Sequence, residues 1–361
     1  MDDDSSVATD GGRPEGSEFI AELAESGASD FSRRDQLVRF ADVYIFAPAR
    51  VARKDWRTVA GSFFLFIFLL MGTVGTRVTD QPGFNDAPRY IKPFNGEYMH
   101  TISIDLFGGT LFAFEFWRYP FGTGGFGQPL LPSLIHATPA MMELVAAGVL
   151  MSILVGAVIG TASGYAGGRV DTVLMMITDI MLTVPGLPLI IVLASVWTPT
   201  DAFMVGLILA IDNWPGLARS VRSQVLTIRE ENYVEASKSL GLGTKDILPK
   251  DILPQMMPYV LINAAGSGRA IIFESVGLYF LGILPSGSIM NWGVMLNTAY
   301  NEGALVNPNR YHWLYVPMIA IIFVSFGLIL LSQGMDRLFN ARLRARHAKT
   351  VGGDDESVDD L

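Results

Sequence analysis

Long apolar runs without charge alternate with polar, charged segments along the chain. Residues 58–76, 144–168 and 311–335 contain no Asp, Glu, Lys or Arg. Each run is as long as the roughly 20 residues that an α-helix needs to cross about 30 Å of hydrocarbon. Buried helices of a soluble enzyme seldom show apolar runs of this length. The pattern therefore predicts transmembrane helices.

Three further segments read as spans that charged residues or prolines interrupt. They are expected at about residues 172–196, 202–218 and 257–284. Ionisable side chains within them cost about 3 kcal/mol each at the bilayer centre, so they should face protein or water. The sequence predicts an all-α integral membrane protein with about six transmembrane helices. The ionisable residues in the interrupted spans are Asp179, Asp212, Arg269 and Glu274.

Composition agrees with a membrane protein and offers little material for catalysis. Half of the residues are hydrophobic, 17% are charged, and the mean hydropathy is +0.37. The chain has no cysteine, which excludes disulfides and thiolate nucleophiles or ligands. The four histidines are widely separated, and no zinc-protease, nucleophile-elbow or phosphate-loop motif is present. We expect a non-enzyme that binds no metal, cofactor or nucleic acid.

Lysine and arginine residues predict the orientation, because they gather in cytoplasmic segments. Basic residues are dense before the first span, between the fourth and fifth, and after the sixth. Both termini and the loop between spans four and five are therefore expected in the cytoplasm of a plasma-membrane protein. The three clusters are Arg33, Arg34, Arg39, Arg50, Arg53, Lys54 and Arg57; Arg219, Arg222, Arg229, Lys238, Lys245 and Lys250; and Arg337, Arg342, Arg344, Arg346 and Lys349.

The two tails are acidic, and a long polar loop separates the first two spans. Residues 1–55 precede the first apolar run and do not resemble a signal peptide, so we expect an uncleaved first span. The carboxylates favour solvated, disordered ends, or a salt-rich cytoplasm of a halophile, and the two are compatible. The loop at residues 77–141 is rich in glycine, proline and aromatic residues, and should be partly ordered outside the membrane.

Small residues recur at every fourth position of the second span. On an α-helix they form one stripe that lets a neighbouring backbone approach closely. We expect this stripe to pack against another helix rather than to contact substrate. Its members are Gly148, Ser152, Gly156, Gly160, Gly164 and Gly168.

The loop between spans four and five has the pattern of a folded element. Thr227 and Glu230 have capping-box spacing, which predicts a helix start. Gly241 can end that helix in the left-handed conformation, and Thr244 can cap a short second helix. The pattern predicts two short helices that meet at a glycine and project from the membrane.

These residues resemble a known family. Glu235-Ala236-Ser237, Gly241 and then Ile252-Leu253-Pro254 are similar to the "EAA" loop of permease subunits in binding-protein-dependent ABC importers. The ordered matches at residues 119–123, 164–171 and 291–295 support the dipeptide/oligopeptide and nickel branch, second-permease (C-type) subfamily. By this resemblance, residues 56–138 hold the first helix and external loop, 139–336 a type I importer permease domain, and 337–361 a tail, with the coupling loop at about 219–256.

The resemblance implies partners and functional residues. The partners are a second permease in a heterodimer, two ATPase subunits that use ATP, and an extracellular solute-binding protein. Ser237 replaces an alanine, and Pro249 falls inside the expected second coupling helix. The residues implied as contacts of the ATPase are Glu235, Ala236, Ser237, Gly241, Ile252, Leu253 and Pro254.

The ionisable residues within the spans leave two alternatives open. Asp179, Asp212, Arg269 and Glu274 border a translocation path, or they clamp helices together. An ion-coupled secondary transporter would use the three carboxylates as a relay, but it gives the capped loop no purpose. The resemblance indicates peptides as the transported solute, while nickel and oligosaccharides remain alternatives.

Overall fold

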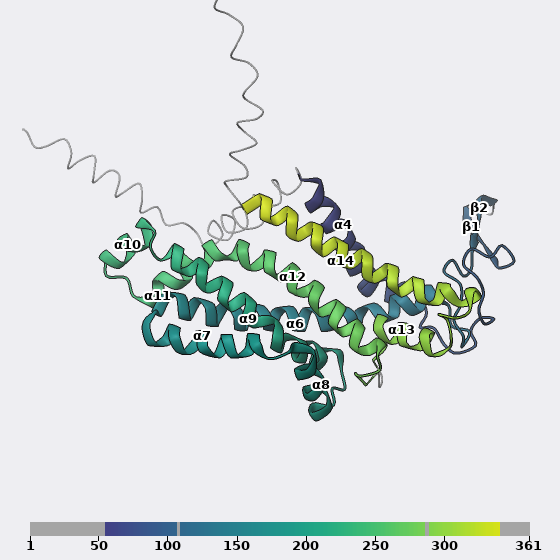
Figure 1. Cartoon of the computed structure of the whole chain (residues 1–361). Helices are drawn as coiled ribbons and strands as arrows, with labels where there is room; N and C mark the ends of the chain where they lie inside the picture. Colours follow the sequence, from purple (N-terminus) through teal and green to yellow (C-terminus); the bar gives the residue numbers. More distant parts are fainter. Residues whose placement is uncertain (1–54, 107–108, 286–288, 340–361) are drawn as a thin grey trace, which may run out of the picture. The chain divides into compact units, whose positions relative to one another are not determined.

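The computed structural model describes residues 55–106, 109–285 and 289–339. The chain divides into two units, residues 1–51 and 52–361, and the first unit lies outside the described residues. The acidic tails predicted at residues 1–55 and 337–361 therefore lie almost wholly outside them too. The described part is mostly helical, which confirms the predicted fold class (Figure 1).

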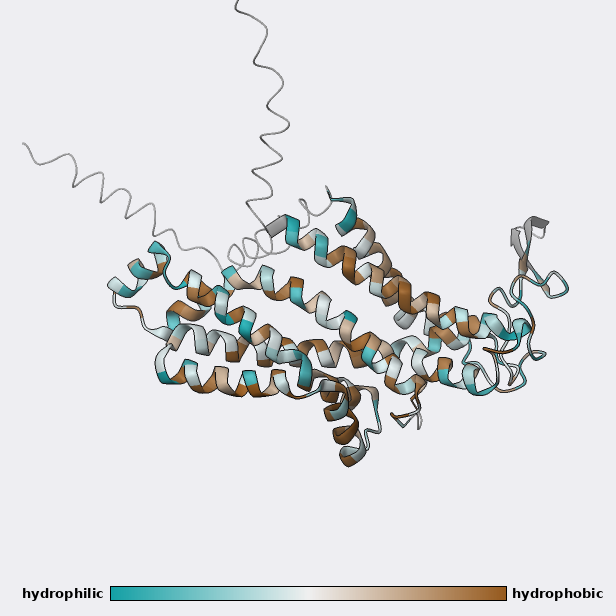
Figure 2. Cartoon of the chain, viewed as in Figure 1, coloured by the Kyte–Doolittle hydropathy of each residue, from teal (hydrophilic) through white to brown (hydrophobic). Residues whose placement is uncertain are grey.

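Within the described residues, three helices are long and apolar enough to cross a membrane, or four if a bent pair counts as one span. The first is α4 (Trp56–Leu70), which continues through a π-helical turn, η2 (Met71–Gly75), into α5 (Thr76–Val78). The others are α6 (Leu130–Ala166) and α14 (Tyr311–Phe339), which follows the 3-10 turn η4 (Pro308–Arg310). The bent pair is α7 (Gly168–Thr183) with α8 (Gly186–Trp197), which meet at 90°. Among these helices, α4, α8 and α14 carry the strongest apolar colour in Figure 2.

The two remaining predicted spans also form long helices. Helix α9 (Ala202–Ile228) has 27 residues and α12 (Leu253–Phe280) has 28. At 1.5 Å per residue each is about 40 Å long, which exceeds the hydrocarbon thickness. Each is less apolar than the other spans because ionisable residues interrupt it. Every segment that the sequence identified as a span is therefore mainly helical, with a break at residues 184–185 and with α12 ending at Phe280.

Helix α6 begins eleven residues before the end of the region predicted as a loop. The segment 130–141 is helical although it contains Pro132 and Pro139. Pro132 lies in the first turn, where a helix uses no backbone N–H, and Pro139 removes only one hydrogen bond. The predicted end of the loop at residue 141 is therefore eleven residues too late.

The polar loop contains a β-hairpin that the sequence analysis did not place. Strand β1 (Met99–Leu106) pairs antiparallel with β2 (Gly109–Trp117), with a shift in register between Ile104 and Asp105. Aromatic residues alternate with small or polar ones along β2, which is the spacing of a strand. The expectation that this loop is partly ordered is confirmed.

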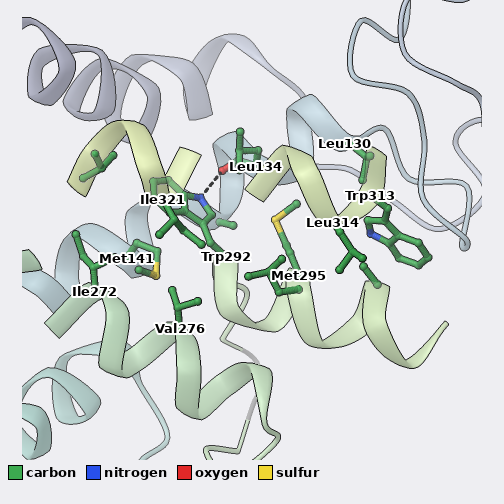
Figure 3. Packing of buried hydrophobic residues seen from close by; sticks show 14 of the residues in the cluster. Leu130, Leu134, Met141, Ile272, Val276, Trp292, Met295, Trp313, Leu314 and Ile321 are labelled. Carbon is green, nitrogen blue, oxygen red and sulfur yellow. Dashed lines mark hydrogen bonds between the residues drawn. The ribbon is translucent and has the colours of Figure 1, made fainter. Parts of the chain in front are cut away.

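A buried cluster joins the helices near the hairpin loop. Helix α13 (Trp292–Asn301) inserts Trp292 between α6, α12 and α14, and its indole Nε1 donates to the Leu134 carbonyl oxygen at 3.3 Å (Figure 3). Trp292 is fully buried, as is Leu130, and Trp313 is almost so. A buried indole needs such an acceptor, because an unpaired N–H in an apolar core costs stability. The cluster fixes α13 against the spans.

The small-residue stripe of α6 packs against α9, as predicted, and the two helices run side by side (Figure 1). A Cβ atom at Gly160 would collide with the Ala218 carbonyl oxygen, and one at Gly206 of α9 with the Leu144 carbonyl oxygen. Only glycine permits this approach of backbones. Gly168 is the exception, because it begins α7 at a φ of +55° with no atom nearby.

Candidate functional site: the elbow and the polar face of α9

We call residues 229–252 the elbow. Helix α10 (Asn232–Ser239) is followed by Gly241, then by α11 (Thr244–Ile247) and a π-helical turn, η3 (Leu248–Ile252). Gly241 has a φ of +82°, and the Leu242 N–H donates to the Ser237 carbonyl oxygen at 3.2 Å. This left-handed ending is the one predicted for Gly241. Two short helices therefore meet at a glycine.

The predicted helix starts in the elbow are wrong in detail. Thr227 still belongs to α9, where its hydroxyl donates to the Ser223 carbonyl oxygen at 3.4 Å, and α10 begins only at Asn232. Thr244 is the first residue of α11 and makes no side-chain cap. The α-helical geometry gives way to a π-helical turn at Leu248, directly before Pro249, which has no N–H to donate. Pro249 therefore changes the helical geometry but does not end the helix, which continues through η3 into α12 (Leu253–Phe280).

The base of the elbow is a small apolar core. Val234, Ile247 and Ile252 are buried together with Val221 and Val225 of α9. Ile252 therefore fixes the elbow to the end of α9 and offers no surface to a partner in this conformation. Leu253 is 39% exposed, and Pro254 is half-buried beside it.

The outer surface of the elbow carries the other predicted contact residues. Glu235, Ala236 and Gly241 are exposed, and Ser237 is half-buried. Leu240, directly after α10, is 80% exposed, and Leu242 beyond the turn glycine is 42% exposed. The sequence analysis did not select Leu240, although an apolar residue directly before the turn glycine could have indicated it.

Tyr233 of α10 lies beside carboxylates. Burial, together with the charges of Glu231 and Asp251, raises the pKa of Tyr233 above its usual value. The phenol is thus neutral at physiological pH and presents a hydroxyl rather than a charge.

Polar contacts connect the elbow to α6. The Arg229 Nη1 atom donates to the Gly164 carbonyl oxygen at 2.8 Å, and the Lys238 ammonium lies 5.9 Å from the ring centre of Tyr165. These contacts satisfy a carbonyl in the last turn of α6, which has no partner within its own helix. The elbow is therefore attached to both α6 and α9.

Ion pairs join α7 to α9 along one face. The Arg222 guanidinium donates twice to the Asp171 carboxylate, at 2.5 and 2.6 Å, and the Ser163 hydroxyl donates to the same carboxylate. Arg219 pairs with Asp179. Asp171, Asp179 and Arg222 line a groove of about 580 Å³. The sequence analysis used both arginines only to set orientation and did not pair them.

Asp212 and Glu274 meet at Asn213. The Asn213 amide nitrogen lies 3.1 Å from an Asp212 carboxylate oxygen and 3.2 Å from one of Glu274, so it joins α9 to α12. Arg269 is exposed on α12 and, among the residues that the structure describes, has no ion-pair partner. If these residues clamp helices, the clamp does not run through Arg269, since it pairs with neither Asp179, Asp212 nor Glu274 in this described part. No sequence signal marked Asn213.

Within the described ranges, no group of three or more histidine or acidic residues could hold a metal ion. Of the ionisable residues of the spans, Asp179 pairs with Arg219, and Asp212 and Glu274 accept from the Asn213 amide.

Comparisons with known proteins show which family and which relatives the chain resembles. Residues 152–345 match the family described as "Binding-protein-dependent transport system inner membrane component". The chain is similar to the oligopeptide transport system permease protein OppC of Bacillus subtilis, with 32% identity over 62% of this chain and 72% of that protein. It is also similar to the dipeptide transport system permease protein DppC of Bacillus subtilis, with 29% identity over 90% of this chain and 93% of that protein.

A third relative and one solved structure show weaker likeness. The oligopeptide permease protein OppC of Lactococcus lactis subsp. cremoris is 28% identical over 62% of this chain and 76% of its own length. The inward-facing MetNI methionine ABC transporter matches 59% of this chain and 97% of its own, with 19% identity and a TM-score of 0.43. With more than half of its length matched by the family, the chain belongs to the inner membrane components of binding-protein-dependent transport systems.

Proposed function

We propose that the chain is the permease subunit of an ATP-driven importer and forms half of a translocation path for peptides or similar small solutes. The relatives named as oligopeptide and dipeptide permeases support peptides, and the DppC relative aligns over 90% of the chain. Nickel and oligosaccharides stay alternatives that the solute retained by the partner binding protein would decide. The exposed elbow is the observation that carries the proposal.

The elbow is the surface that an ATPase subunit binds. Glu235, Ala236, Ser237 and Gly241 are accessible, and their mostly small side chains let a partner surface come close. Leu240 adds an exposed apolar anchor, the kind of residue that fills a pocket in a partner. Ile252 holds the elbow on its base, whereas Leu253 is exposed and Pro254 half-buried, so these two stay accessible to a partner.

The remaining components follow from the family. We expect a second, different permease chain as partner, two ATPase subunits that bind ATP, and an extracellular solute-binding protein. This chain would bind no cofactor itself. The basic clusters described above support a cytoplasmic position for both termini and the elbow.

The polar face of α9 borders the translocation path. The side chains of Asp179 and Arg219 are each 56% exposed, and an exposed ion pair is costly in lipid. Water or the second permease must therefore cover this face. Asp179 and Asp212 line the translocation path. Glu274 joins α12 to α9 through Asn213, and Arg269 on α12 faces a partner or water.

A secondary transporter that uses Asp179, Asp212 and Glu274 as a relay is the other candidate. It predicts uptake by this chain alone, driven by a proton or sodium gradient. The membership in a binding-protein-dependent family favours the ATP-driven importer. Uptake into vesicles with ATP and the partner subunits, against uptake with an ion gradient and this chain alone, discriminates the two.

The substitution Gly241→Asp tests the elbow. It places a side chain and a charge at an exposed position whose φ is +82°. We expect ATP-driven uptake to fall at least about tenfold while the protein still inserts and assembles. Gly266→Ala is the control, because no atom within 4 Å would meet its Cβ and it lies outside the elbow. Normal uptake by Gly241→Asp would remove the main argument for the proposed function.

A further inference from the structure

The polar residues of α9 lie on one face and meet the broken span α7–α8. Asp212, Arg219 and Arg222 follow one another at intervals of seven and three residues, which places them on the same side of a helix. Arg222 binds Asp171 and Arg219 binds Asp179 of α7. Asp212 lies against the first residue of α8, because a Cβ at Gly186 would collide with its carboxylate. A single face of α9 thus contacts both halves of the broken span.

The broken span has little other support within the described part of the chain. Helix α7 packs against α6 and α9, and α8 packs mainly against α9. The opposite sides of the two helices are apolar and exposed, as at Val173, Met176 and Val192. Because the halves meet at 90° around Pro185, neither half stiffens the other. The position of α7 therefore depends on its contacts with α6 and α9.

Helix α9 is also the helix that leads into the elbow. It ends at Ile228, and the elbow core packs on Val221 and Val225 in its last turns. The backbone contact with the α6 glycines makes α6 and α9 one stiff body. A force on the elbow is consequently delivered to α9 as a whole.

The two ion pairs differ in how firmly they hold α7. The Asp171 and Arg222 side chains are 19% and 30% exposed, and two parallel hydrogen bonds fix their relative orientation. The pair of Asp179 with Arg219 is more exposed and is expected to contribute less. Apolar contacts between α7 and α9 resist separation, but they have no direction and allow sliding. The directional contact between Asp171 and Arg222 is the one that fixes the register of α7 on α9.

The geometry points to Asp171 and Arg222 as the positioning pair that makes the broken span move with the elbow during transport. This inference rests on the proposed function, because it assigns the route by which motion at the ATPase surface reaches the translocation path. Asp171 and Arg222 touch no substrate in this scheme. They keep α7 in register with α9 while α9 is displaced, and Arg219 with Asp179 is a weaker second contact on the same face.

Charge reversal in the assembled transporter tests the pair. We expect Asp171→Arg or Arg222→Asp alone to lower solute moved per ATP hydrolysed at least about tenfold. The double reversal, Asp171→Arg with Arg222→Asp, should restore that ratio to within about threefold of the unmodified protein. Arg57→Gln is the matched control, because it removes a side-chain hydrogen bond of 3.0 Å to Gln333 between α4 and α14. Its ratio should not change.

The amount of solute moved per ATP hydrolysed distinguishes a positioning pair from a pair that only stabilises the fold. A merely structural pair would reduce the amount of assembled complex and leave the solute moved per ATP in the surviving complex unchanged. That result, or a double reversal no better than the single ones, would overturn the inference. If a charge-reversal variant does not assemble, Asp171→Asn replaces it in the same measurement, because asparagine keeps the side-chain volume.

Distances between spin labels distinguish failure of this inference from failure of the proposed function. The chain has no cysteine, so introduced cysteines take spin labels specifically. One doubly labelled protein carries cysteines at Gln224 of α9 and Ile322 of α14, and a second carries them at Met176 of α7 and Ile322; all three positions are exposed. In the assembled transporter, ATP should change both the α9–α14 and the α7–α14 distance. In Asp171→Asn only the α9–α14 distance should change. An α9–α14 distance that ignores ATP refutes the proposed function, whereas an α7–α14 distance that still responds in the variant refutes the positioning pair alone.

Discussion

The two faces of α9 are built from opposite kinds of contact. Toward α6, glycines let the two backbones touch, as at Gly160 and Gly206. Toward α7 and α8, long charged side chains reach across, as at Arg219 and Arg222. On the first face, short apolar side chains of α9 pack directly on the α6 glycines, as at Val221 and Val225. The second face has two arginines that can rotate and re-form their bonds. One helix is therefore fixed on one side and adjustable on the other.

This difference would let α9 transmit motion to α7 while its packing against α6 stays unchanged. Close-packed backbone contacts have one arrangement, so α6 and α9 must move together. Charge-assisted hydrogen bonds specify direction and tolerate changes of angle through the flexible arginine side chain. In the proposed coupling, the elbow, which is attached to both α6 and α9, displaces these two helices, and the ion pairs then determine how α7 follows.

The largest effect is expected at the face toward α6. The substitution Gly160→Leu forces a side chain against the Ala218 carbonyl oxygen and should destabilise the folded protein by about 3 kcal/mol or more. Thermal unfolding of the purified protein in detergent measures this loss. A Gly160→Leu protein that unfolds at the same temperature as the unmodified one would show that the backbones are not held together here.

A smaller effect is expected at the ion pairs, and it should differ between them. Asp171→Asn removes charge from two short hydrogen bonds and from the contact with Ser163, and should cost about 2 kcal/mol. Asp179→Asn weakens an exposed pair and should cost less than about 1 kcal/mol. The same unfolding measurement compares the two variants. Equal losses would contradict the distinction between the pairs.

The glycine of the elbow should give a local effect of about 1 kcal/mol. Gly241→Ala places a Cβ on a residue with a φ of +82°, where an L-residue is strained by about 1–2 kcal/mol. Gly243 has a φ of −81°, so Gly243→Ala is the matched control and should cost nothing. Hydrogen exchange of the α10 amides reports the change in local stability. Faster exchange in both variants alike would mean that the left-handed turn is not what ends α10.

The smallest effect on stability is expected at Leu240. Since its side chain is 80% exposed, Leu240→Ser should change the free energy of unfolding by less than about 0.5 kcal/mol. ATP-driven uptake should nevertheless fall severalfold, because the leucine anchors the ATPase in the proposed function. Parallel measurement of unfolding and uptake tests this separation, and unaltered uptake would remove Leu240 from the contact surface.

The sequence specified the parts that depend on local pattern. Uncharged runs predicted the apolar spans because the bilayer thickness sets their length. The four-residue spacing of Gly148 to Gly164 predicted a packing stripe, and Gly241 predicted the turn, because both consequences follow from a missing Cβ. Neither conclusion required knowledge of which helix lies opposite.

What the sequence did not specify are contacts between distant segments. Arg222 meets Asp171 across 51 positions, and Asn213 meets Glu274 across 61. Nothing in the local sequence pattern distinguishes Arg222 from the arginines that were used only to predict the orientation. The start of α10 was missed because Thr227 has the spacing of a cap, yet α9 continues through it, held by the elbow core. Tertiary packing decided that boundary.

The most direct test of the account is a cross-link from the elbow to the ATPase. Because the chain has no cysteine, Ala236→Cys supplies one thiol on the exposed surface of α10. In the assembled transporter, a short bifunctional reagent should join this cysteine to the ATPase subunit, and the cross-linked complex should no longer transport solute. A transporter that moves solute with ATP but in which the Ala236→Cys thiol reacts with no ATPase subunit would contradict the account.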